Sequence, residues 1–163
     1  PHWWLHSRDV MTRIDHVNIV VSDMERSVRF YTETLGLRRG FETTLEGEWV
    51  ERVTGLPGAR AHCVFMETDD PTVRLELLQY LSPEGEGLEL NTLPNTLGLR
   101  HLAFTLPDDE ALTALAEKLR AADIPLVSGP VEVPFTVANL GRKRLFYFHD
   151  PDGVIIEAAA YAW

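Results

Sequence analysis

Two stretches of the chain repeat one order of hydrophobic and polar positions. In the first stretch, residues 13–21 (RIDHVNIVV) alternate and are rich in β-branched residues, which predicts a strand. Ser22 and Glu25 have capping-box spacing, which predicts the start of a helix, and Gly36 predicts its end. The apolar residues of this segment fall on one helical face: Met24, Val28, Tyr31 and Leu35.

The same order returns at residues 99–125, where a short strand leads into a second amphipathic helix that ends before Pro125. Its apolar stripe consists of Leu112, Leu115, Ala116, Leu119 and Ala122. Three shorter segments punctuated by Gly and Pro follow each helix, and all read as strands. They are residues 38–45, 59–68 and 72–80 in the first half, and 125–133, 143–150 and 153–161 in the second.

This repetition predicts an internal duplication with a period of roughly 80 residues. His101 occupies the place of His16, and Glu157 precedes Tyr161 by four residues as Glu76 precedes Tyr80. We therefore expect an α+β fold with two tandem βαβββ modules that form curved mixed sheets around a shared cavity. The expected parts are an N-terminal arm (1–11), a first module (12–81), a polar linker (82–96) and a second module (97–163).

The amino-acid composition argues against two classes of binding partner for this protein. The formal net charge of −10 repels phosphate backbones and anionic lipid surfaces, so we expect neither nucleic acid nor membrane as a partner. No apolar run approaches the roughly 20 residues that span a bilayer. Cys63 is the only cysteine and can form no intramolecular disulfide, which favours a cytoplasmic protein.

A carboxylate lies inside the apolar final strand, at Glu157. A buried charge needs a proton, an ion pair or a bound cation, because leaving it unpaired costs several kcal/mol. Each half carries one histidine on its first strand and one glutamate on its last. If the two halves pack with their sheets curved towards each other, two imidazoles and two carboxylates converge, which is a suitable ligand set for a divalent first-row metal.

Several motifs resemble the vicinal oxygen chelate superfamily, which includes glyoxalase I, methylmalonyl-CoA epimerase, extradiol dioxygenases and resistance proteins for fosfomycin and bleomycin. The resemblance runs from Thr12 to Tyr161, and its most specific parts are the FY…LG helix end and the DPDG turn at residues 150–153. It implies one divalent ion (Zn, Ni, Co, Mn or Fe) with ligands on the first and last strands of each module. Those positions hold His16, Glu76, His101 and Glu157.

The resemblance also implies a chemistry. In the isomerase, epimerase and lyase branches, the ion stabilises the enolate of a chelated carbonyl substrate while a carboxylate moves a proton. Glu157 is the favoured base here, with Glu76 nearly equivalent and Glu48 an outside candidate. The residues expected to contact a small-molecule substrate are Asn18 and Tyr80, on the ligand-bearing strands, and the aromatic residues of two matched loops, Trp49 and Phe135.

Several alternatives stay open. An extradiol-type dioxygenase of the same fold uses two histidines and one carboxylate, and a non-enzymatic protein could sequester a drug or metabolite in the same cavity. Arg74 could pair with Glu76 on the strand surface. The basic run at 141–144 could meet an anionic substrate or form a solvated hairpin. The modules could pair within one chain or exchange between the two chains of a homodimer.

Overall fold

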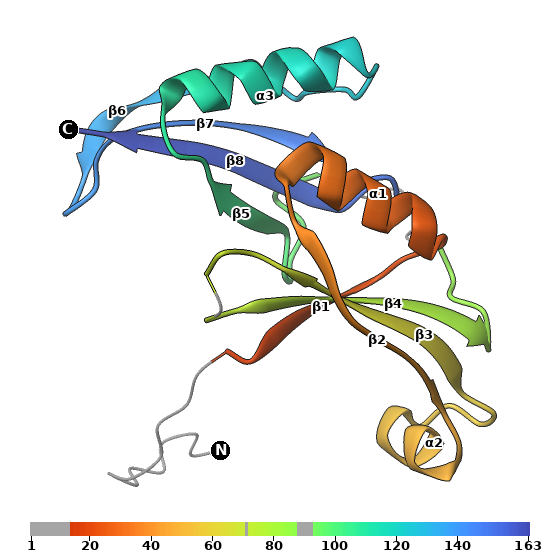
Figure 1. The fold of residues 1–163 in the computed structure, drawn as a ribbon. Helices are drawn as coiled ribbons and strands as arrows, with labels where there is room; N and C mark the ends of the chain where they lie inside the picture. The colour runs from red at the N-terminus through yellow and green to blue at the C-terminus, as the bar shows by residue number, and fades with distance from the viewer. Residues whose placement is uncertain (1–13, 71, 88–92) are drawn as a thin grey trace, which may run out of the picture.

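The computed structural model describes residues 14–70, 72–87 and 93–163, so the arm predicted at residues 1–11 lies outside it. The first half forms a four-stranded sheet (Figure 1). Its outer strand β1 pairs in parallel with β4, and the remaining neighbours are antiparallel. In spatial order the strands are β1 (His16–Val20), β4 (Arg74–Ser82), β3 (Arg60–Glu67) and β2 (Arg38–Glu46).

The second half repeats this topology strand for strand. Here β5 pairs in parallel with β8, and the other neighbours are antiparallel. The spatial order is β5 (His101–Thr105), β8 (Ile155–Ala162), β7 (Gly141–His149) and β6 (Val131–Val137). The two matching mixed sheets, each with its helix, confirm the α+β fold with tandem βαβββ modules.

Helix α1 (Met24–Leu35) differs from the prediction at its first turn. The N-cap is Asp23, whose carboxylate accepts from the backbone N–H of Arg26. The predicted cap, Ser22, instead donates its hydroxyl to Asp152 of the second half. The predicted stop is correct, because Gly36 adopts the left-handed conformation with φ of 71°.

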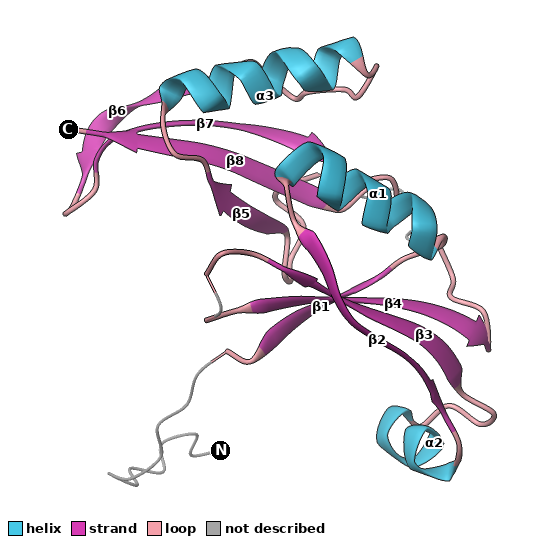
Figure 2. Cartoon of the chain, in the orientation of Figure 1, coloured by secondary structure: helices cyan, strands magenta, loops and turns pink. Residues whose placement is uncertain are grey.

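Helices α3 (Asp109–Ala121) and α2 (Glu48–Thr54) lie far apart, with α3 on the second sheet and α2 beside the end of β2 (Figure 2). Helix α3 packs on β8 and buries Leu112, Leu115, Ala116 and Leu119, while Ala122 is exposed as the C-cap. Helix α2 is a short helix that follows β2 and contains Trp49. The segments around Trp49 and Phe135 were predicted as loops, but Trp49 is in this helix and Phe135 is in β6.

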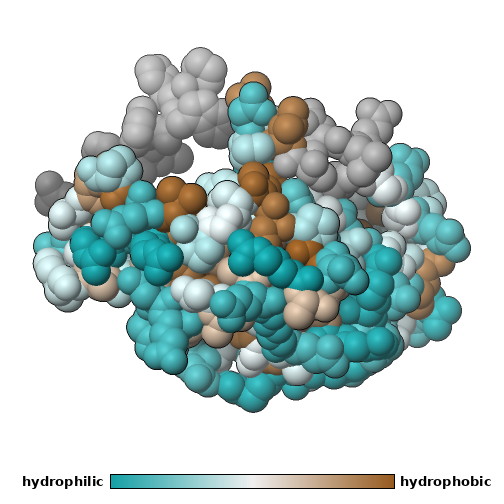
Figure 3. All heavy atoms as spheres, turned by 90° about the horizontal axis from the view of Figure 1, so that it is seen from above, coloured by the Kyte–Doolittle hydropathy of each residue, from teal (hydrophilic) through white to brown (hydrophobic). Residues whose placement is uncertain are grey.

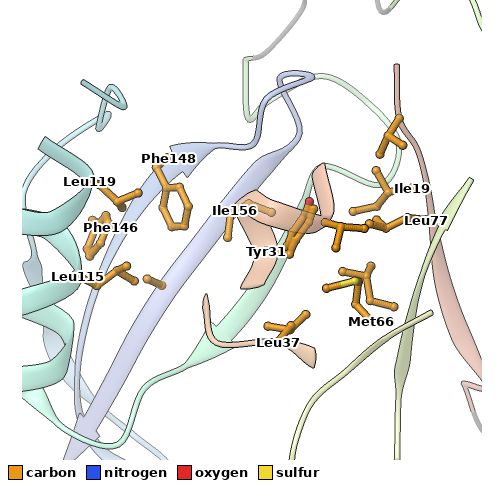
Figure 4. Close-up of a cluster of buried hydrophobic side chains, with 14 of the residues drawn as sticks. Ile19, Tyr31, Leu37, Met66, Leu77, Leu115, Leu119, Phe146, Phe148 and Ile156 are labelled. Atoms are coloured by element: carbon orange, nitrogen blue, oxygen red, sulfur yellow. The ribbon is translucent and has the colours of Figure 1, made fainter. Parts of the chain in front are cut away.

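One hydrophobic core extends across both halves. Figure 4 shows Tyr31 of α1 between Ile156 of the second sheet and Leu77 and Met66 of the first. The buried Tyr31 hydroxyl donates to Asp150 Oδ2 at 2.8 Å. Helix α1 therefore joins the modules through apolar packing and through hydrogen bonds to the DPDG turn.

The face of the molecule seen from above is mainly polar (Figure 3). Seen from above, most of the visible face is hydrophilic, with small groups of apolar side chains between the charged ones (Figure 3). None of the helices within the described ranges is long and apolar enough to cross a bilayer.

Candidate active site

The parallel pairing of β1 with β4 places the first predicted histidine beside the first predicted glutamate. His16 Nε2 lies 3.5 Å from Glu76 Oε2. Asn18, directly opposite Glu76 in the register, donates its side-chain N–H to the same oxygen at 3.1 Å. The Cys63 thiol donates to Glu76 Oε1 at 3.5 Å. Both donors that the hydrogen bonds of the described residues bring to this carboxylate, the Asn18 amide and the Cys63 thiol, are neutral groups.

The sequence left open an ion pair between Arg74 and Glu76, but the structure pairs Arg74 with Asp15 instead. Its side chain points to Asp15, with Nη2 2.6 Å from Asp15 Oδ2, and its guanidinium carbon lies 4.7 Å from the centre of the Phe65 ring. These contacts leave Glu76 facing His16 and Asn18.

The second half repeats the pair on β5 and β8. His101 Nε2 lies 3.2 Å from Glu157 Oε2, and the imidazole ring lies beside the ring of Tyr147. Glu157 is only 5% exposed, as its apolar neighbours in the sequence predicted. Tyr147 lies directly opposite it in the register. Each module thus brings one imidazole nitrogen next to one carboxylate oxygen.

Lys143 is the charge partner that burial of Glu157 requires. Its ammonium Nζ lies 2.6 Å from Glu157 Oε1. Burial alone lowers the pKa of Lys143, but the Glu157 carboxylate outweighs that effect and the pKa lies above its usual value. From the sequence we expected a bound metal ion to balance this charge, whereas the structure places a lysine of β7 beside it.

The basic run at 141–144 is evident in the sequence, but its contact with Glu157 is not. Alternation along β7 contains the missing signal, because Lys143 and Tyr147 are four residues apart and share one face of the strand. Antiparallel pairing of β7 with β8 places Tyr147 opposite Glu157 and Lys143 opposite Tyr161, on the same face of the sheet. Pairing register, which the sequence did not reveal, makes the lysine part of the site.

The four predicted ligands form two pairs on two separate sheets. Among residues 14–70, 72–87 and 93–163, no three His, Cys, Asp or Glu side chains lie close enough to hold one ion. The spacing within each pair nevertheless suits metal binding. Two donors at about 2.1 Å from one ion, at angles of about 90–110°, lie about 3.0–3.4 Å apart. The observed separations of 3.5 and 3.2 Å are close to that range.

A cavity of about 600 Å³ lies between the modules. It is bordered by β1, the end of β4, the segment after β4 and the start of β5, and its lining includes Asn18, Tyr80 and His101. Trp49 and Phe135 are not part of this lining, and their exposed fractions are 56% and 67%. The structure therefore brings Asn18 and Tyr80 to this cavity and leaves Trp49 and Phe135 on the surface.

Burial makes the Cys63 thiol a poor nucleophile. Its pKa is raised to about 12, first by burial and then by the negative charge of Glu76. The thiol therefore serves as a neutral hydrogen-bond donor on the Glu76 carboxylate.

Comparison with known proteins adds to this geometry. A family model described as the Glyoxalase/Bleomycin resistance protein/Dioxygenase superfamily matches residues 13–158. A 2-epi-5-epi-valiolone epimerase from Actinomyces sp is 28% identical over 148 residues, covering 88% of this chain and 76% of the epimerase. The uncharacterized protein YwbC of Bacillus subtilis is 31% identical, covering 89% of this chain and 94% of that protein.

The fold of this chain matches that of a solved structure over almost its whole length. The crystal structure of a glyoxalase family protein from Bacillus cereus is 27% identical, with a TM-score of 0.79, and the match covers 98% of this chain and 100% of that one. The repeated βαβββ topology, the paired histidines and glutamates and the family match agree with one another. The chain belongs to the Glyoxalase/Bleomycin resistance protein/Dioxygenase superfamily.

Proposed function

We propose that the chain is a divalent-metal-dependent enzyme that moves a proton at the carbon next to a substrate carbonyl, as an isomerase, epimerase or lyase does. One observation carries the proposal. An imidazole nitrogen lies beside a carboxylate oxygen in both halves, at the spacing of two ligands on one ion. The similarity to a protein named as an epimerase supports this class of reaction.

The donor set fits a first-row ion, because two imidazoles and two carboxylates neutralise its double charge. His16, Glu76, His101 and Glu157 would hold it. Bound there, the ion would act as a Lewis acid that withdraws charge from the substrate carbonyl.

A complete set of ligands requires the two pairs to face each other. We propose that a homodimer provides this arrangement, with the first half of one copy against the second half of the other. The separation of the pairs onto two sheets of one chain supports exchange between copies over pairing within a chain.

Complementation tests this arrangement. His16→Ala and His101→Ala each damage one half of every site. A mixed dimer of the two variants contains one fully intact site, because its undamaged halves meet there. Recovery of activity and of metal binding on mixing supports exchange between copies, whereas pairing within one chain yields no recovery.

The two glutamates differ in how firmly they are held. Glu157 is almost fully buried in an ion pair with Lys143, so moving its carboxylate breaks a contact between opposite charges. Glu76 accepts from the neutral donors Asn18 and Cys63 and is more accessible. The sequence favoured Glu157 as the base, but these contacts favour Glu76 as the group that moves the proton and Glu157 as the fixed ligand.

Two substitutions separate these roles. Glu76→Gln keeps an oxygen that can bind metal but removes the proton acceptor. We expect it to abolish exchange of the substrate proton at saturating metal, while Glu157→Gln weakens metal binding and retains more exchange. A greater loss of exchange in Glu157→Gln at saturating metal would return the base to Glu157.

Deuterium exchange tests the proposed function as a whole. The purified protein, loaded with Zn²⁺, Ni²⁺, Co²⁺ or Mn²⁺, is incubated in D₂O with small ketones and acyl thioesters that carry a proton next to the carbonyl. Incorporation of deuterium that is lost in His16→Ala and retained in the control His62→Ala supports the proposal. Oxygen consumption with catechols and no exchange indicates a dioxygenase. Binding of small aromatic molecules without metal or exchange indicates sequestration.

A further inference from the structure

Asp15 contacts His16, the first of the proposed ligand histidines, from the side away from Glu76. Its Oδ2 atom lies 2.8 Å from His16 Nδ1 and also accepts from Arg74 Nη2 at 2.6 Å. Asp15 immediately precedes β1, and Arg74 is the register partner of His16 on β4. The parallel pairing of these two strands therefore sets the positions of all three groups.

Phe65 completes this arrangement from the neighbouring strand β3. The His16 ring meets the Phe65 ring edge-on, with centres 5.8 Å apart and an angle of 84° between the planes. Arg74 covers the same aromatic ring. The imidazole is therefore held at one nitrogen by a carboxylate and along its edge by an aromatic ring, which restricts both its tilt and its rotation.

A carboxylate accepts but does not donate, so the His16–Asp15 hydrogen bond requires the proton to be on Nδ1. In a neutral imidazole the other nitrogen, Nε2, then carries the free electron pair, and it is this atom that lies 3.5 Å from Glu76 Oε2. We propose that Asp15 is a positioning residue that fixes His16 in the Nδ1–H form and aims Nε2 at the metal position. The metal-binding part of this inference rests on the proposed function, whereas the proton position does not.

The second half orients its histidine differently. The residue before His101 is Arg100, and the His101 ring lies beside Tyr147, with ring centres 5.2 Å apart. A carboxylate at the preceding position is therefore a feature of the first half, and removing it should affect His16 and leave His101 unchanged.

Nitrogen NMR of the metal-free protein provides the direct test. Long-range ¹H–¹⁵N spectra at a pH of about 8.5, where an ordinary imidazole is neutral, distinguish Nδ1–H from Nε2–H rings. Comparison with His16→Gln assigns the signals. We expect the Nδ1–H form at His16 in the wild type and its loss in Asp15→Ala. The matched control is Asp69→Ala, which removes the same charge from an exposed pair with Arg38 and should leave the spectrum of His16 unchanged.

Zinc titration gives a second measurement. Loss of a residue that orients a ligand typically lowers metal affinity about 10–100-fold, and we expect a decrease of that size in Asp15→Ala but not in Asp69→Ala. An Nε2–H ring at His16 in the wild type, or equal zinc affinity of Asp15→Ala and the wild type, would overturn the inference. Failure of the wild type to bind zinc would refute the proposed function, while the NMR result decides separately whether Asp15 sets the proton position.

Discussion

Removing Lys143 tests how the buried carboxylate of Glu157 is stabilised. The substitution Lys143→Met keeps most of the aliphatic volume and deletes the ammonium group 2.6 Å from Glu157 Oε1. Breaking a buried ion pair from one side costs about 3–5 kcal/mol, because the remaining buried charge loses its oppositely charged partner. The Glu157 side chain is 6% exposed but that of Lys143 is 19% exposed. We therefore expect a loss near the lower end, about 3 kcal/mol of unfolding free energy.

Urea denaturation of the metal-free protein measures this loss. With a slope of about 2 kcal/mol per molar urea, the midpoint should fall by about 1.5 M. The double variant Lys143→Met/Glu157→Gln should recover part of the loss, since no unpaired charge remains. The control is Lys118→Met, which changes the other lysine of the chain at an exposed position on α3. A loss below about 1 kcal/mol, or strict additivity in the double variant, would refute this account of Glu157.

Three further predictions concern titratable groups. Burial first, and the Asp150 charge second, raise the pKa of Tyr31 well above 10, so the folded chain keeps a proton that the unfolded chain loses. Stability should thus fall as pH rises above about 10, with a contribution of about 1.4 kcal/mol per pH unit that Tyr31→Phe removes in alkaline denaturation curves. The Cys63 thiol, with a pKa of about 12, should react with a disulfide reagent at pH 8 far more slowly in the native protein than in urea, and equal rates would contradict its burial. Hydrogen bonds from Arg39, and then from His62, lower the pKa of Glu42 to about 2, so the stability that it contributes is lost as pH falls from its usual value of 4.5 towards 2. Carboxyl NMR should place the Glu42 titration higher in Arg39→Met, and an unchanged midpoint would exclude this ion pair as the cause.

Local pattern was sufficient to predict the repeated fold. The alternation in residues 16–21 and the helical spacing of Met24, Val28 and Tyr31 reflect which side chains each element buries. The cap of α1 was misassigned because Asp23 and Ser22 are both good N-cap residues. Ser22 is used instead in a contact with Asp152, 130 positions away, which no local pattern reveals.

The candidate residues were found from the sequence, but their arrangement and surroundings were not. The repeat matched His16 with His101 and Glu76 with Glu157, and the sequence predicted one convergent set of four, whereas the structure places each histidine beside the glutamate of its own half. Lys143 joins Glu157 only through the register of β7 with β8. The segment of Trp49 was interpreted as a loop from its glycines and proline, but residues 48–54 between Gly47 and Gly55 form a helix.

Calorimetric titration with a divalent ion tests the central claim most directly. The account predicts one Zn²⁺ or Ni²⁺ ion bound per chain by the wild type and by the control His62→Ala. It also predicts that His16→Ala and His101→Ala, which change different halves, each weaken binding of that ion at least about tenfold. A wild type that binds no divalent ion, or binding that is unchanged in either of these two variants, would contradict a shared metal site built from both halves.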